Sequence, residues 1–256
     1  QTMEPTDVVP PVFAGIGANG TYPCTDPPVF SSPTASDDCS TATITFIDGV
    51  TGTNCAGDII TRTWTATDVC GNTSTGEQTM EPVDNTSGVL AGIGADGTYV
   101  CTESPVFSSP TSSDDCSTTV ITFADVITDS NCAGDVITRT WTSTDECGNT
   151  STGEQTMTPT DIVPPVFAGV GANGTYVCTE TPVFSSPTAS DDCSTATITF
   201  VDAVTSMNCA GDLITRTWTA TDDCGNTTTA EQTMEPTDVV PPVFAGIGAN
   251  GTYPCT

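Results

Sequence analysis

The chain has 256 residues, of which 32 are acidic and only three are basic, and its net charge at pH 7 is −29. A nucleic-acid-binding groove is excluded, because cations must replace the counterions of the phosphates. The chain has neither histidine nor lysine, which excludes histidine-dependent triads, histidine zinc sites and Schiff-base catalysis.

Other features of the composition point to an ordered, all-β chain. Charged residues make up 14% of the chain and hydrophobic residues 36%, a balance unlike that of disordered acidic proteins. Abundant Thr, Val and Ile favour strands, and 23 Gly and 19 Pro separate short segments. No apolar run approaches the roughly 20 residues of a membrane span. We therefore expect short strands throughout, with about seven in each stretch of about 77 residues, as in a small immunoglobulin-like β-sandwich.

Taken in chain order, the first 80 or so residues predict a short strand, a glycine-rich loop, a strand interrupted by proline, and three further strands. The segment 48–58 is expected to be a loop with one short edge strand. Residues 59–68 form the clearest strand, with Ile60, Trp64 and Ala66 on one face and threonines on the other. The expected strands cover residues 12–14, 22–24 with 29–30, 41–47, 59–68 and 73–80.

The cysteines reveal an internal repeat with a period of about 77 residues, seen for example in Cys24, Cys101, Cys178 and Cys255. The segment 232–256 repeats residues 1–25 without a change. A period this long predicts tandem domains and not a thin solenoid. We expect the sequence to be part of a longer array of such domains. The predicted limits are 1–7 (end of a preceding repeat), 8–84, 85–161 and 162–238 (three full repeats), and 239–256 (start of a fourth).

Acidic residues recur at the same period, in two loops and in the segment that leads into each repeat. In an immunoglobulin-like domain these three places lie at one end, so the carboxylates are expected to meet at the junctions between domains. Hard cations such as Ca²⁺ bind six to eight oxygen ligands, and three arginines cannot balance the acids. The sequence therefore predicts calcium sites, and ordinary turn-forming acids are the alternative. The candidate ligands are Glu4, Asp7, Asp37, Asp38 and Asp68; Glu81, Asp84, Asp114, Asp115 and Asp145; and Asp161, Asp191, Asp192 and Asp222.

The strings PTASDDCS, TITF, ITRTWTATDxCGNT and QTMxPTDxVPP, repeated along the whole chain, resemble hyalin-type (HYR-like) immunoglobulin-fold repeats. The likeness is greatest to those of giant cell-surface adhesins and filament proteins of Bacteroidota. The resemblance implies an extracellular adhesion or filament stalk, and it implies no catalyst.

Four cysteines per repeat allow three pairings. Placement at the two ends of a sandwich favours Cys39–Cys70 at one end and Cys24–Cys55 at the other, each stabilising the domain by about 2–4 kcal/mol. A cysteine zinc site is the alternative, but no C-x-x-C spacing is present. The equivalent expected pairs in the later repeats are Cys116–Cys147, Cys101–Cys132, Cys193–Cys224 and Cys178–Cys209.

Arg62 precedes Trp64 by two residues on the clearest strand, and we expect it to pair with a carboxylate and to cover Trp64 with its stem. Several Asn residues stand in N-x-S/T triplets, which are glycan acceptors only in a eukaryotic secretory protein. In the second repeat, Asp84 is followed by Asn85 where the first repeat has Val8, and the later diproline is lost, which puts the rigidity of that junction in question.

Together these features predict an extracellular, non-catalytic stalk or filament segment in which calcium rigidifies the junctions. Its expected partners are further repeats of the same chain. The alternative function is a repeat that binds a carbohydrate or a protein, and side-by-side association of chains into a homo-oligomeric fibre is a third interpretation. Disulfide chemistry places such a protein outside the cytoplasm.

Overall fold

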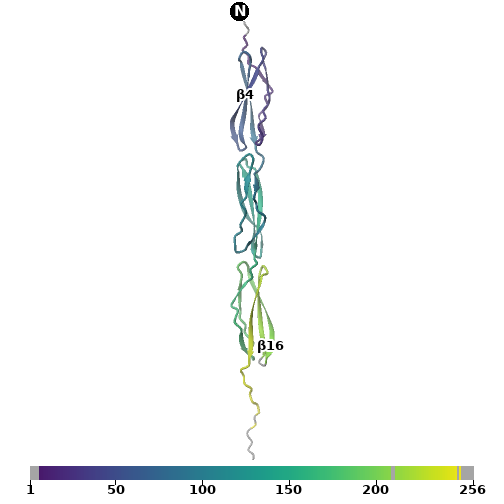
Figure 1. Cartoon of the computed structure of the whole chain (residues 1–256), viewed down its shortest axis with the longest axis vertical. Helices are drawn as coiled ribbons and strands as arrows, with labels where there is room; N and C mark the ends of the chain where they lie inside the picture. The colour runs from purple at the N-terminus through teal and green to yellow at the C-terminus, as the bar shows by residue number, and fades with distance from the viewer. Residues whose placement is uncertain (1–5, 209–210, 247, 249–256) are drawn as a thin grey trace, which may run out of the picture. The chain divides into compact units, whose positions relative to one another are not determined.

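In a computed structural model of the chain, residues 6–208, 211–246 and 248 are described, and every regular element in them is a β-strand (Figure 1). None of these residues lies in a helix that could cross a membrane. The prediction of an all-β, tandemly repeated and disulfide-bonded chain is confirmed. Each copy has six strands among the residues that the structure describes, so the expected number of about seven is slightly too high.

The six strands of the first copy are β1 (Val12–Ala14), β2 (Gly20–Pro23), β3 (Thr34–Ser36), β4 (Thr43–Asn54), β5 (Gly57–Thr67) and β6 (Thr73–Val83). The second copy has β7 (Val89–Ala91), β8 (Gly97–Val100), β9 (Thr111–Ser113), β10 (Thr119–Asn131), β11 (Gly134–Asp145) and β12 (Thr150–Thr160). The third has β13 (Val166–Ala168), β14 (Gly174–Val177), β15 (Thr188–Ser190), β16 (Ala196–Asn208), β17 (Gly211–Asp222) and β18 (Thr227–Thr237).

The chain divides into two compact units, and each contains one junction between successive copies. The first unit holds residues 1–97, 106–127 and 137–157, and the second holds 98–105, 128–136 and 158–256. These limits cut through the second copy, so they do not test the predicted domain limits, which stay a prediction.

Each of the two outer copies contains a four-stranded and a two-stranded sheet. In the first copy the large sheet has the order β2-β6-β5-β4, with β2 parallel to β6 and the other pairs antiparallel. Strands β1 and β3 form the small antiparallel sheet. The third copy repeats both sheets, with the order β14-β18-β17-β16 and the pair β13–β15.

The core lies on one face of the large sheet. Trp64 and Ala66 of β5 are 3% and 0% exposed, and Met80 of β6 is also buried. The Phe30 ring meets the Trp64 ring edge-on, with 6.4 Å between the ring centroids. The face predicted for Trp64 and Ala66 is therefore confirmed, and the core is small, as expected for so short a domain.

A compensating pair of residues shows how closely the loop after β1 packs on this sheet. A Cβ atom added to Gly76 of β6 would lie 2.0 Å from Cδ1 of Ile16. The third copy has Ala230 at the position of Gly76, and it has Val170, which lacks that Cδ1 atom, at the position of Ile16. Loop and sheet are thus matched in volume within each copy, as close packing of interiors requires.

The segment 48–58 is not the loop that the sequence suggests. Strand β4 continues to Asn54 and pairs with β5 up to Gly57, with a register shift between Val50 and Gly52. The hairpin turn is closed by Asn54, whose side-chain oxygen accepts a hydrogen bond from the Ala56 amide at 2.8 Å. Gly57 follows with φ of 129°, a conformation that favours glycine. The glycines and mostly exposed side chains of this half-strand hide the strand pattern.

The lost diproline of the second copy is compensated by two hydroxyl groups. Gly88 stands where the first copy has the fully buried Pro11. Ser112 and Ser143 replace two alanines, and their Oγ atoms form a hydrogen bond of 2.6 Å. A Cβ on Gly88 would lie 2.7 Å from the Ser112 Oγ. The hydroxyls therefore occupy the space of the proline ring, and β7 still pairs with β9.

The arginine of each copy is held between a carboxylate and two aromatic rings. Arg62 donates to both oxygens of Asp48, at 2.6 and 2.7 Å. Its guanidinium lies 4.3 Å from the ring centroid of Phe30 and 3.9 Å from that of Phe46. The hydrogen bond from Arg62 holds the pKa of Asp48 below its ordinary value. The expected structural role for this arginine agrees with these contacts, although its guanidinium covers phenylalanine rings.

Replacement of Arg62 by methionine is expected to destabilise the first copy by about 1–3 kcal/mol. Cation–π contacts contribute about 0.5–2 kcal/mol each, whereas a half-exposed ion pair contributes at most about 1 kcal/mol. Asp48→Asn removes the ion pair and keeps the stacking, so it should cost less than Arg62→Met. Urea unfolding of the two variants measures both, and an equal or larger loss for Asp48→Asn would show that the ion pair dominates.

Candidate metal centre at the junctions between copies

The cysteines of successive copies are bonded to each other, and the predicted pairing within a copy is wrong. Cys24 pairs with Cys116 and Cys55 with Cys147 in the first unit, with Cα–Cα distances of 5.8 and 5.1 Å. In the second unit the same positions pair as Cys101–Cys193 and Cys132–Cys224. Cys39, Cys70 and Cys178 carry no bond in the described part of the chain, and Cys209 lies outside it.

The topology explains why the cysteines reach across. Strand β2 runs parallel to β6, and β6 leads directly into the next copy. The Cys24 amide donates to the Val83 carbonyl at 3.1 Å, so Cys24 lies where the chain leaves the first copy. Cys55 occupies the tip of the β4–β5 hairpin. The pairing predicted from the sequence requires Cys24 and Cys55 to lie at the same end of the domain. Their disulfide partners, however, belong to the following copy.

Carboxylates from three segments meet beside the first pair of bridges. One oxygen of each of Asp84, Asp114 and Asp145 lies within 4.8 Å of the others. Asp84 comes from the linker, Asp114 from the loop after β9, and Asp145 from the end of β11. Asp84 and Asp145 are each 6% exposed. The predicted convergence of linker and loop acids therefore occurs at this junction.

The second junction repeats the arrangement with Asp161, Asp191 and Asp222, again within 4.8 Å of one another. At the start of the first copy, Asp7 and Asp37 lie together with Cys39. The three groups thus bring together eight of the candidate calcium ligands, from linkers and loops as the sequence predicts.

Several predicted ligands are not in these groups. Asp38, Asp115 and Asp192 are the second members of the aspartate pairs, and all three are exposed. Glu81 is an exposed residue of β6, and Asp68 is buried but is absent from the group of Asp7 and Asp37. Glu4 lies outside the described residues. Adjacent aspartates point to different surroundings in these loops, a distinction that the sequence does not reveal.

Local hydrogen bonds fix each carboxylate. Asp114 Oδ1 accepts from the amides of Cys116 and Ser117 at 2.9 and 3.2 Å. The side chain of Asn149 donates to Asp145 Oδ2 at 2.8 Å and also to the Asp84 carbonyl at 3.2 Å. One asparagine thus ties the linker to the loop after β11, and the carboxylates are oriented before any ligand binds.

Hydrogen bonds of this kind hold two of these groups, Asp84 and Asp222, in the charged form. Burial raises the pKa of Asp84, but hydrogen bonds from Thr86 and Ser117 outweigh it, so the pKa lies below its ordinary value. Burial also opposes ionisation of Asp222, and the amide groups of Asn226 again bring the pKa below its ordinary value. Both carboxylates are therefore charged at neutral pH, as a cation site requires.

Two carboxylate oxygens have no partner at all. Among the described residues, Asp7 Oδ2 and Asp161 Oδ2 are buried and accept no hydrogen bond. In the first junction the equivalent oxygen, Asp84 Oδ2, accepts from the Ser117 hydroxyl at 3.2 Å. A buried acceptor without a partner is costly, so these two oxygens favour a bound cation at their sites.

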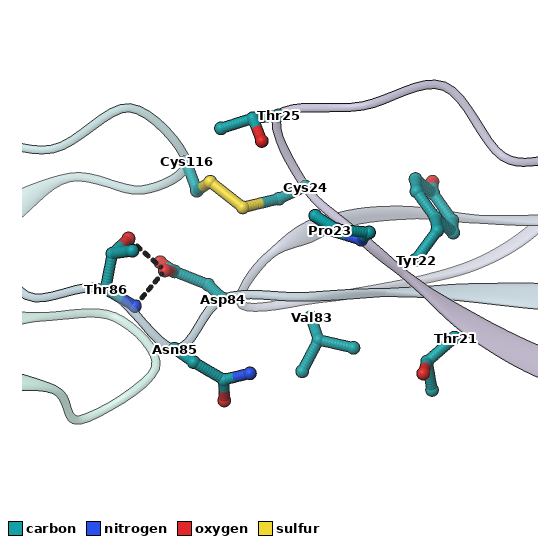
Figure 2. A pocket seen from close by; sticks show the side chains of 10 residues that line it. All are labelled: Thr21, Tyr22, Pro23, Cys24, Thr25, Val83, Asp84, Asn85, Thr86 and Cys116. Carbon is teal, nitrogen blue, oxygen red and sulfur yellow. Dashed lines mark hydrogen bonds between the residues drawn. A yellow bond between two sulfur atoms is a disulfide. The ribbon is translucent and has the colours of Figure 1, made fainter.

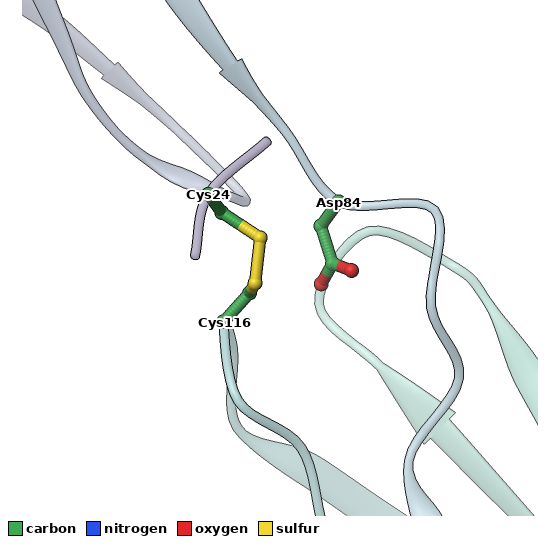
Figure 3. Close-up of side chains that lie close together, drawn as sticks. All are labelled: Cys24, Asp84 and Cys116. Carbon is green, nitrogen blue, oxygen red and sulfur yellow. A yellow bond between two sulfur atoms is a disulfide. The ribbon is translucent and has the colours of Figure 1, made fainter. Parts of the chain in front are cut away.

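The neighbouring sulfur atoms are not ligands. Asp84 lies beside Cys24 and Cys116, but the two sulfurs are joined to each other (Figure 3). A disulfide offers no thiolate to a metal. The hollow at this junction is lined by both copies, and Figure 2 shows Thr86 donating to Asp84 beside the bridge. The donor set of the site is therefore oxygen.

Comparison with known proteins gives no family. No family model matches the chain, and no curated protein matches it. Among solved structures, mouse cadherin-23 EC22–24 is 14% identical with a TM-score of 0.35, and the match covers 90% of this chain and 99% of that one. Drosophila N-cadherin EC1–4 is 12% identical with a TM-score of 0.30, covering 90% and 76%. The human desmocollin-1 ectodomain is 10% identical with a TM-score of 0.29, covering 90% and 61%. Likeness at these TM-scores says nothing about ligands.

Proposed function

We propose that the chain is a structural, non-catalytic segment of an extracellular stalk or filament, whose junctions bind calcium. The observation that carries the proposal is the recurrence at two junctions of three clustered carboxylates beside two disulfides that join successive copies. Disulfides of this number belong to oxidising, extracytoplasmic surroundings. The resemblance to hyalin-type repeats agrees with such a role.

Calcium fits the donor chemistry of the clusters. Ca²⁺ takes carboxylate and carbonyl oxygens in flexible geometry and keeps water in the remaining positions. Three carboxylates within 4.8 Å of each other repel in the absence of a cation. Binding of a divalent ion offsets this repulsion and gives the unpartnered Asp161 Oδ2 a cation to coordinate.

The buried tryptophans favour a structural role for each copy over a role as a binding module. Binding sites for carbohydrates or proteins are usually lined by aromatic or apolar side chains. Trp64, Trp141 and Trp218 are each 3% exposed, so the tryptophans serve the core. The hollow of Figure 2 has one aromatic residue among those that line it, Tyr22, beside Pro23, Val83, small polar residues and the bridge.

Calorimetric titration of the intact, oxidised protein tests the calcium sites. We expect binding with a Kd of about 10⁻⁴ to 10⁻³ M, the range of extracellular modules. Asp191→Asn should abolish binding at the second junction, whereas Asp192→Asn, its exposed neighbour in sequence, should leave binding unchanged. Equal effects of the two variants, or no binding by the wild-type protein, would contradict the site.

The two junctions should differ in affinity. Asp84 already receives hydrogen bonds from Thr86 and Ser117, whereas Asp161 Oδ2 receives none. Asp161→Asn should therefore remove more of the calcium affinity than Asp84→Asn. At calcium about tenfold above Kd, each filled site raises the unfolding free energy by about 1.4 kcal/mol.

The bridges change the expected response to a chelator. Pairing within copies would leave only the linker between them, and calcium removal would then give a flexible string. Two disulfides cross each described junction. Chelation is therefore expected to loosen the local geometry of the junction while successive copies stay tied, and solution scattering in calcium and in chelator measures this.

A further inference from the structure

The spacing of the disulfides gives the chain a second covalent route from one copy to the next. Every described bridge joins residues 92 positions apart, which is longer than the period of the repeat. In the second copy all four cysteines are bridged. Cys116 and Cys147 bond to the first copy, and Cys101 and Cys132 bond to the third. Bridges to opposite neighbours therefore alternate along the sequence of this copy.

Only short segments separate these alternating bridges. Cys101 to Cys116, Cys116 to Cys132 and Cys132 to Cys147 are steps of about 15 residues each, with a fully extended length of about 50 Å. Two of the three segments are strands, β10 of 13 residues and β11 of 12 residues. A strand already rises about 3.3 Å per residue, close to the limit of about 3.5 Å. The two segments that contain β10 and β11 can therefore be lengthened only slightly by stretching.

We propose that the disulfides form a continuous covalent load path which bypasses the fold and makes the second copy nearly inextensible under tension. A copy without such bridges lengthens on unfolding to about 77 residues of chain, or roughly 270 Å. In the bridged copy, tension passes from Cys116 through β10 to Cys132 and never reaches most of the chain of that copy. The core and the strand ladder are then spared from carrying the load.

This load path goes beyond the proposed stalk role, because it depends on the bridges and not on calcium. The carboxylate clusters contribute noncovalent contacts, which do not limit the length of the chain. The bridges limit that length even if the sandwiches unfold. The same offset between bridge span and repeat period recurs in both described junctions, so the arrangement belongs to the repeat and not to one copy.

Stretching the intact 256-residue protein between handles at its two ends tests the proposal. The shortest covalent route from Gln1 to Thr256, through Cys24–Cys116 and Cys132–Cys224, holds about 70 residues or roughly 250 Å, against roughly 900 Å for the open chain. We expect the oxidised protein to stop at about 250 Å. After addition of a reductant, the same protein is expected to extend to about 900 Å.

An oxidised chain that releases lengths of a whole copy would overturn the proposal. The limit does not require folded copies, so stretching the oxidised protein in urea should give the same maximum length, and a longer one would also overturn it. A chelator should leave that length unchanged. Failure of calcium binding and failure of the load path are thus separate outcomes, because the first is read by titration and the second by contour length.

Discussion

Replacing both Cys24 and Cys116 by serine is expected to lower the free energy of unfolding of the intact chain by about 4 kcal/mol. The bridge closes a loop of 92 residues, and loop-closure entropy gives about 4–5 kcal/mol for that length. The companion bridge Cys55–Cys147 shortens the effective loop only moderately, since closure entropy varies with the logarithm of length. Urea unfolding monitored by circular dichroism measures the loss.

The matched control is the double variant Cys39→Ser with Cys70→Ser. These two cysteines carry no bond in the described structure, so their removal should change stability by less than about 0.5 kcal/mol. Pairing within copies makes the opposite prediction, because Cys39–Cys70 would then be a bridge. A large loss in the control variant, or none in Cys24→Ser with Cys116→Ser, would contradict the pairing across the junction.

The cysteine pairing shows where sequence reasoning ends. The positions of the cysteines at the ends of strands can be predicted from the sequence, since Cys24 follows a strand and Cys55 lies in a hairpin turn. Pairing then depends on which ends meet, and both pairings place the same cysteines at the same ends. The even number of cysteines in each copy favours pairing within it.

The carboxylates were more predictable because their placement follows from connectivity alone. The linker and the loops before β10 and β12 must share one end of a sandwich, so Asp84, Asp114 and Asp145 meet. Which member of each aspartate pair joins them is decided by backbone turns. Asp114 accepts the amides of the two residues after Asp115 and is held inward, while Asp115 is exposed. The spacing of the aspartates in the sequence does not show which member of each pair is held inward.

Strand β4 marks the limit of pattern-based assignment. Its first half alternates and is predictable, but its second half, with Gly49 and Gly52, has low strand propensity. This half forms because β5 offers a continuous row of hydrogen-bonding groups up to Gly57. Tertiary pairing thus overrides local preference, and only the turn chemistry of Asn54 and Gly57 could have signalled a hairpin.

Trp141→Ala is expected to destabilise the second copy by about 3–5 kcal/mol, the cost of deleting a large buried aromatic side chain. Trp141 is 3% exposed and meets the Phe107 ring edge-on, with ring centroids 6.3 Å apart. The Arg139 guanidinium in turn lies 4.2 Å from the Phe107 ring centroid. Loss of the indole leaves Phe107 without its aromatic partner, and it weakens the support that Phe107 gives to Arg139.

The control is Val106→Ala, because Val106 adjoins Phe107 in sequence and is 82% exposed, so its truncation should cost less than about 0.5 kcal/mol. Total stability of domains this small is only about 5–15 kcal/mol, so Trp141→Ala should consume much of it. The bridges limit the denatured ensemble but supply no apolar contacts, and they cannot replace the lost core. Hydrogen exchange should therefore accelerate in β11 and β12 of the oxidised Trp141→Ala protein while the disulfides stay intact. Unchanged exchange there would mean that the bridges, and not the tryptophan, hold the second copy together.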